Sequence, residues 1–144
     1  MLVLIGIIPH SLYDLVPADL NGRYFDQLSP RTPMERYNLF IQTTPSLFAD
    51  DASFQQAPTL SIEDISVRRE RQTFTRLEKS DAVLFTVRTY MQPLTELPQE
   101  EIEGLVSQIE SWEGEMGVYK GVQNWGHLVL GWCGEQMGRD IKKV

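Results

Sequence analysis

The residues with the clearest chemical potential are arginines, which gather in one stretch of an otherwise acidic chain. Residues 67–90, VRRERQTFTRLEKSDAVLFTVRTY, pass without a break from a cationic half into an apolar half. The arginines of this stretch are Arg68, Arg69, Arg71, Arg76 and Arg88. The arginine side chain offers a planar fork of donors that matches a carboxylate or a phosphate. Such a cluster beside a buried strand indicates either an internal ion-pair network or a site for an anionic group.

These two interpretations of the arginine cluster both stay open. In one, two of the side chains hold an anionic ligand such as a cofactor propionate. In the other, the arginines pair with nearby acids of the same chain, which are Glu63, Asp64, Glu70 and Glu78. Because structural ion pairs are commoner than ligand sites, spacing alone favours the internal network.

The other chemically active side chains do not form a known motif. The chain has two histidines, His10 and His127, and a single cysteine, Cys133. One cysteine excludes an intramolecular disulfide and a CxxC metal site. The sequence contains no HExxH, P-loop, GxGxxG or GxSxG pattern. We expect Cys133 to be a buried, inert thiol on an apolar helix face.

A second group of residues combines aromatic rings with a cation. It consists of Tyr119, Lys120 and Gly121, followed by Trp125. It fits either the rim of a cavity with a polar handle or the start of a helix with Trp125 in the core, and the second interpretation is favoured.

Composition bounds the class of protein. The chain has 144 residues, the size of one domain, so we predict a single domain over residues 1–144. The formal net charge of −7 argues against general nucleic-acid binding, because such proteins carry a basic surface. The apolar start, MLVLIGII, is too short to span a membrane and lacks the basic region of a signal peptide. We therefore expect no membrane association and, by default, a cytoplasmic protein.

Strand and helix patterns share the chain. We predict strands over residues 2–8, 36–43, 62–68 and 82–91, helices over residues 15–28 and 119–137, a helical turn or two over residues 70–77, and a long loop over residues 44–59. A further helix opens at Pro98 and is broken by Gly114 and Gly117. Its apolar stripe consists of Ile102, Leu105, Ile109 and Trp112.

Three ordered blocks of the sequence resemble the haem-dependent oxidative N-demethylase-like family, long known as a domain of unknown function. Residues 68–90 are similar to the family pattern LRxERQTLxRLPxSGAVxFTIRTY. Residues 34–48 resemble its VxRxNWxIQ…LF segment, and residues 119–125 its YKG…W segment. Where the central pattern has proline and glycine, this chain has Glu78 and Asp81.

The resemblance implies an α+β fold with a PAS-like antiparallel sheet, flanked by helices, that cradles haem b. It also implies oxidation of a small methylated amine with release of formaldehyde, with electrons handled by flavin and iron–sulfur partner subunits. On this basis we predict that Arg71, Gln72, Arg76 and Arg88 bind the cofactor. We predict that the Tyr90 hydroxyl donates a hydrogen bond toward a bound amine or oxygen species.

Two departures from the family support an alternative. Family members are longer, so the resemblance covers the C-terminal part of their domain, and an incomplete sheet with exposed apolar surface would favour self-association. The family also has IHxPVPxY where residues 6–13 read GIIPHSLY, so its histidine falls on Ile7. His10, our candidate for cofactor and metal contact, is displaced by three positions. The alternative is a non-catalytic remnant or binding module of this fold without haem.

Overall fold

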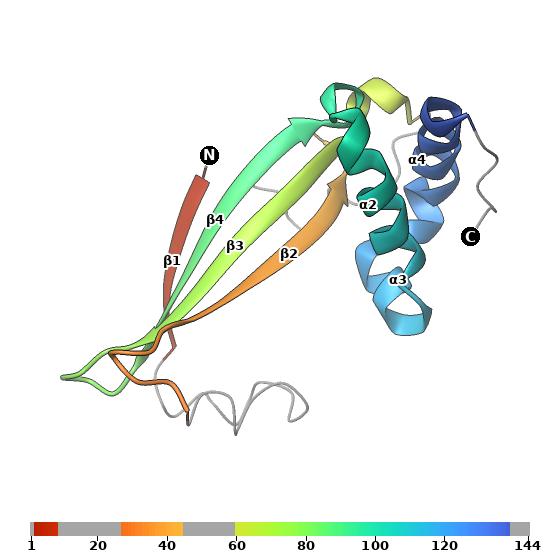
Figure 1. The fold of residues 1–144 in the computed structure, drawn as a ribbon. Coiled ribbons are helices and arrows are strands. Elements are labelled where there is room, and N and C mark those ends of the chain that lie inside the picture. Colours follow the sequence, from red (N-terminus) through yellow and green to blue (C-terminus); the bar gives the residue numbers. More distant parts are fainter. Residues whose placement is uncertain (1, 9–26, 45–59, 139–144) are drawn as a thin grey trace. The chain divides into compact units, whose positions relative to one another are not determined.

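The computed structural model describes residues 2–8, 27–44 and 60–138, and for residues 2–8 it describes the backbone only. The elements, labelled in Figure 1, are β1 (Leu2–Ile8), β2 (Met34–Gln42), the 3-10 helix η3 (Ile62–Asp64), β3 (Ser66–Arg76), β4 (Val83–Pro93), the 3-10 helix η4 (Leu94–Glu96), α2 (Gln99–Glu110), α3 (Gly114–Lys120) and α4 (Val122–Met137). None of the helices in these ranges has both the length and the hydropathy that crossing a membrane requires.

The strands form a sheet in the order β1-β4-β3-β2. β1 runs antiparallel to β4, with Leu2 opposite Thr89. β3 and β4 form a hairpin, in which the Leu77 amide donates to the Ala82 carbonyl at 2.8 Å. An antiparallel sheet followed by helices is an α+β fold, which confirms the predicted fold class. The likeness to a PAS domain stays a prediction.

Asp81 closes this hairpin in a left-handed conformation. Its φ angle is 56°, and its amide donates to the Leu77 carbonyl at 3.0 Å. Its carboxylate accepts a hydrogen bond from the Arg76 guanidinium at 2.9 Å. Left-handed backbone favours glycine, which the family pattern has here, although aspartate tolerates it. The contact with Arg76 therefore stabilises a turn that the pattern builds with glycine.

Contacts within the chain cluster into two compact units. The first comprises Met1–Leu39 and Arg69–Tyr90, and the second Phe40–Arg68 and Met91–Val144. Whether the chain is a single domain stays a prediction.

The first unit packs one face of its strands. Leu28, Phe74 and Val83 are buried together, with Met34 and Phe85 against them. The rings of Phe74 and Phe85 stack at 4.6 Å between centroids, as expected for cross-strand neighbours on one side of a hairpin.

The helical turn predicted over residues 70–77 is wrong, because these residues lie in β3 and the turn that follows it. Glu70, Gln72 and Phe74 are buried, whereas Arg71 between them is partly exposed. This is the period of two that defines a strand. Two of the three buried positions carry polar side chains, so the hydrophobic pattern does not reveal the strand.

Three of the predicted strands are confirmed as β1, β2 and β4. The strand predicted over residues 62–68 begins only at Ser66, because η3 comes first behind its capping residue Ser61. The helix predicted over residues 15–28 and the loop predicted over residues 44–59 lie almost wholly outside the described residues.

The second unit packs α2 and α3 against α4. The stripe predicted for α2 is confirmed: the buried side chains here are Ile102, Leu105, Val106, Ile109 and Trp112. The single helix predicted over residues 119–137 is instead two helices, because Gly121 adopts a φ of 73° and ends α3. In α4, Trp125 is buried as predicted, whereas Trp132 is only partly buried.

The prediction that Gly117 breaks a helix is wrong, because Gly117 lies inside α3. A Cβ atom at this position would lie 2.7 Å from the Trp112 carbonyl oxygen, closer than van der Waals contact allows. The missing side chain therefore lets α3 approach the backbone that follows α2.

Candidate functional site

The first unit has a second sheet face that the core does not cover. Because side chains alternate along a strand, the residues of β2, β3 and β4 that alternate with those of the packed face lie on this second face. Five of them carry chemistry and are called the open face here: Glu35, Tyr37, Arg71, Arg88 and Tyr90. The exposed fractions of Tyr37 and Tyr90 are 74% and 43%, so both rings are accessible to a ligand.

Glu35 and Arg71 form the strongest contact of the open face. Both Nε and Nη2 of Arg71 lie 2.6 Å from Oε2 of Glu35. The Tyr37 hydroxyl donates to Oε1 of the same carboxylate at 2.6 Å. The hydrogen bond from Arg71, followed by that from Tyr37, lowers the pKa of Glu35, and the bond to Glu35 raises the pKa of both Arg71 and Tyr37.

Arg88 and Tyr90 lie within electrostatic reach of this pair. After the larger effects of Arg71 and Tyr37, the charge of Arg88 also lowers the pKa of Glu35. After the larger effect of Glu35, Tyr90 also contributes to raising the pKa of Arg71. The structure therefore brings together three predicted site residues, Arg71, Arg88 and Tyr90.

Gln72 and Arg76 do not join the open face. Gln72 is buried on the packed face, where it accepts from Nε of Arg36 at 2.5 Å and donates to Glu70 at 2.8 Å. Arg76 donates from Nε to the Leu28 carbonyl at 2.9 Å, besides its contact with Asp81. These contacts fit a structural role for both residues.

The acidic partners of two arginines differ from those expected from the sequence. Arg71 and Arg76 pair with Glu35 and Asp81, neither of which is among the four acids expected from spacing. Glu35 and Tyr37 lie in the second resembling block, and a strand alternation that places them beside β3 is the signal that would have identified them.

A lysine in the second unit is held by aromatic rings. Lys120 is only 5% exposed, and its Nζ lies 3.6 Å from the ring centroid of Phe40 and 5.1 Å from that of Trp112. Its carbonyl accepts from Nε1 of Trp125 at 3.1 Å, and Trp125 is buried as the favoured interpretation predicted. Lys120 and Trp125 therefore belong to the core of this unit, whereas Tyr119 is exposed.

The remaining candidates from the sequence are the cysteine and the two histidines. Cys133 is buried as predicted, and this burial raises its thiol pKa from 9.0 to about 11. His10 lies outside the described residues, and His127 is exposed on α4. No group of three histidine, cysteine, aspartate or glutamate side chains in the described part of the chain is arranged to hold a metal ion.

An α+β protein with an arginine- and tyrosine-bearing sheet face is the class that the geometry defines. The family model for the haem-dependent oxidative N-demethylase, alpha subunit-like, matches residues 18–130. The chain therefore belongs to this family, as the three resembling blocks predicted. A search of curated proteins found no match.

The family name implies haem, and the open face fits part of that group. Guanidinium groups bind carboxylates strongly, and the exposed rings of Tyr37 and Tyr90 offer flat surface to a macrocycle. Arg71 and Arg88 therefore suit the two propionates. No histidine or cysteine of the described ranges lies on this face, so the open face provides for the anionic edge and the plane rather than for an imidazole or thiolate iron ligand.

Proposed function

We propose that the chain is a haem-binding, oxidative N-demethylase-like protein that acts on a small methylated amine. The observation that supports this proposal is the meeting of Arg71, Arg88 and Tyr90 on one exposed face. These residues come from two strands of the block that resembles the family most closely, and they lie beside a second exposed tyrosine.

The two arginines and the two tyrosines of the open face each have a proposed role. Arg71 and Arg88 hold the propionates through charge-assisted hydrogen bonds, and the tyrosine rings lie against the macrocycle. When bound, haem supplies one-electron and oxygen chemistry that side chains lack. Tyr90 donates a hydrogen bond to the nitrogen of a neutral amine and thereby orients its methyl group. Flavin and iron–sulfur subunits are the proposed electron donors.

Haem titration of the purified chain, followed at the Soret band, tests the cofactor assignment. Arg88→Ala should weaken haem binding by about tenfold, because one charge-assisted contact is lost. Arg31→Ala, which removes an exposed arginine away from the open face, is the matched control and should bind like the wild type. Absence of a Soret shift in the wild type would contradict the assignment.

Glu35→Gln should change haem affinity in the opposite direction from Arg88→Ala. The Glu35 carboxylate occupies Arg71 and repels a second carboxylate, so its neutralisation should tighten haem binding severalfold. Weaker binding by this variant would show that the propionates do not use Arg71.

The role of Tyr90 can be separated from cofactor binding. With haem loaded and a chemical reductant supplied, Tyr90→Phe should keep its Soret band and release less formaldehyde from dimethylamine than the wild type. Equal formaldehyde release would remove Tyr90 from the proposal.

A second candidate is a binding module without haem. It is favoured by the observation that Arg71 and Arg76 already have partners within the chain, namely Glu35, Asp81 and the Leu28 carbonyl. A protein that purifies without colour and gives no Soret shift, yet unfolds cooperatively, would support this candidate.

A further inference from the structure

The second unit exposes apolar side chains on one short helix. Five large hydrophobic side chains are exposed in the described ranges, and three of them lie on α3. Met116 is 50% exposed, and Val118 and Tyr119 are each 69% exposed. Exposed apolar side chains gathered on one helix mark an interaction site more often than scattered single residues do.

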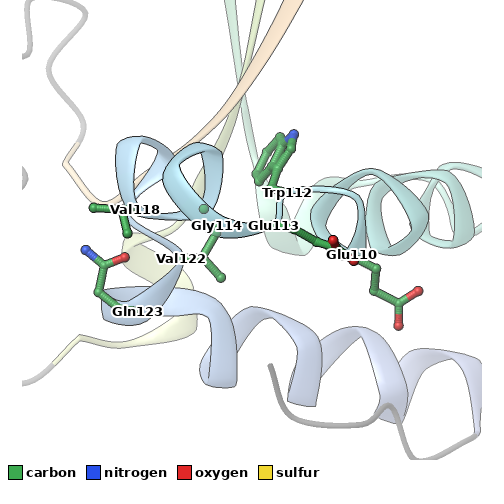
Figure 2. Close-up of a pocket in the computed structure, with 8 residues that line it drawn as sticks. Glu110, Trp112, Glu113, Gly114, Val118, Val122 and Gln123 are labelled. Carbon is green, nitrogen blue, oxygen red and sulfur yellow. The ribbon is translucent and has the colours of Figure 1, made fainter.

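Of these side chains, Val118 lines a groove of about 470 Å³. Val118 and Gln123 lie at one end of it and Glu110 at the other, with Val122 between them (Figure 2). Trp112 also lines the groove. Its volume suits one large apolar side chain together with part of the backbone that carries it.

The groove is built from groups that are fixed in place. Trp112 is 7% exposed and packs edge-on against Trp125 at 6.2 Å. Gly117 holds α3 against the Trp112 carbonyl, since a Cβ atom there would clash at 2.7 Å. A preformed surface loses little entropy when it binds a partner.

The surroundings of the groove are strongly acidic. Glu110, Glu113 and Glu115 are exposed, and the one basic residue within residues 99–123 is Lys120. Lys120 is 5% exposed among aromatic rings, so it offers little charge to a partner. Complementarity therefore favours a basic partner surface.

We propose that the α3 surface formed by Val118 and the groove docks a partner protein. The docking segment presents an apolar side chain flanked by lysine or arginine. The apolar side chain fills the groove beside Val118 and Val122, and the flanking cations lie opposite Glu110 and Glu113. This proposal does not depend on haem binding, because all of these residues lie in the second unit.

Two synthetic helical peptides provide the probe. One carries leucine along one face and lysine elsewhere, and its matched partner has glutamate in place of each lysine. Fluorescence anisotropy of the labelled peptides, titrated with the full chain at physiological salt, should show binding of the basic peptide and at least about tenfold weaker binding of the acidic one. Equal binding of the two peptides would overturn the proposal.

Variants separate local docking from general attraction to an acidic protein. Glu110→Gln with Glu113→Gln should weaken binding of the basic peptide about fivefold. Glu78→Gln with Glu135→Gln changes the net charge equally at exposed positions away from the groove and should leave affinity unchanged. Equal weakening by both pairs would reduce the effect to net charge and overturn the proposal.

Val118→Gln tests the apolar contact and should weaken binding about fivefold to tenfold. Should this variant fail to fold, the glutamate pairs still decide. Displacement of the peptide by millimolar tetramethylammonium would assign the groove to a small cation instead. A dimer of the chain alone that Val118→Gln dissociates, measured by sedimentation, would assign the surface to a second copy. Either outcome overturns the proposal.

Discussion

Arg71 and Lys120 lie in two blocks of the same family resemblance, yet the two units hold these cations in opposite ways. Arg71 is 43% exposed in its side chain and pairs with one carboxylate, that of Glu35. Lys120 is 5% exposed and faces the rings of Phe40 and Trp112. The first cation remains accessible to an external anion, whereas the second is enclosed by the core.

This difference shows that a cation in a motif block is not by itself evidence for a ligand site. An exposed ion pair contributes little to stability, so Arg71 can exchange Glu35 for another carboxylate at little cost. A cation over aromatic rings away from water contributes more. Function is therefore expected at Arg71 and stability at Lys120.

The largest effect should follow Lys120→Ala, which removes both the cation–π contacts and buried methylenes. We expect a loss of about 2–4 kcal/mol in the free energy of unfolding. Urea denaturation followed by tryptophan fluorescence measures this directly, because all three tryptophans lie in the second unit.

Arg71→Ala is the matched comparison and should leave the urea midpoint nearly unchanged, since the ion pair with Glu35 is exposed. Lys120→Met keeps the aliphatic volume and should fall between the two. Equal destabilisation by Arg71→Ala and Lys120→Ala would break the distinction between an accessible and an enclosed cation.

A pair of glycines in the second unit gives the next effect. Gly117→Ala should destabilise the protein by about 1–3 kcal/mol, because the added methyl group meets the Trp112 carbonyl. Gly131→Ala in α4 meets nothing within 4 Å and should stabilise by up to about 1 kcal/mol through helix propensity. Thermal unfolding by circular dichroism compares them, and a stabilising Gly117→Ala would contradict the close packing of α3.

Cys133, a buried group of the second unit, should make the stability of the protein depend on pH. Burial raises its thiol pKa from 9.0 to about 11, so the folded protein holds this proton more tightly than the unfolded chain does. The resulting stability is present below pH 9 and is lost as the pH rises from about 9 to 11. Cys133→Ala should flatten this part of the stability profile, and rapid reaction of the native thiol with a disulfide reagent at pH 8 would contradict its burial.

The smallest effect concerns the titration of Glu35. Its pKa is lowered chiefly by Arg71 and slightly by the charge of Arg88, so the stability it contributes is present above its unfolded pKa and is lost as the pH falls. Nuclear magnetic resonance titration should show a rise in the Glu35 pKa in Arg71→Ala and a smaller rise in Arg88→Ala. An unchanged value in Arg88→Ala would place Arg88 away from the open face.

The sequence predicted the regular elements best where burial and hydrophobicity coincide. The stripe of α2 and the alternation of β4 are apolar, and both were predicted correctly. β3 was mistaken in part for a helical turn because its buried face carries Glu70 and Gln72. Gln72 accepts a hydrogen bond from Arg36 and donates one to Glu70. Arg36 lies on another strand, so local sequence cannot show this chain of contacts.

The candidate site was predictable in its residue types but not in its partners. The family block named Arg71, Arg88 and Tyr90, but the helical turn predicted over residues 70–77 did not put Arg71 on the sheet. Their shared face follows from β3 of the structure. The pairing of Arg71 with Glu35 spans 36 positions of sequence, so spacing within the block pointed to the wrong acids. Lys120 differs from the arginines because it is enclosed by aromatic rings. These rings come together only when the second unit folds, so the sequence does not show them as neighbours.

The central claim is that the guanidinium groups of the open face bind the propionates of haem. Its most direct test compares the affinity of the chain for haem and for haem dimethyl ester, which has the same macrocycle and iron but no propionate charge. We predict that the ester binds at least about tenfold more weakly and that Arg88→Ala reduces this difference. Equal affinity for the two compounds in the wild type would contradict the claim.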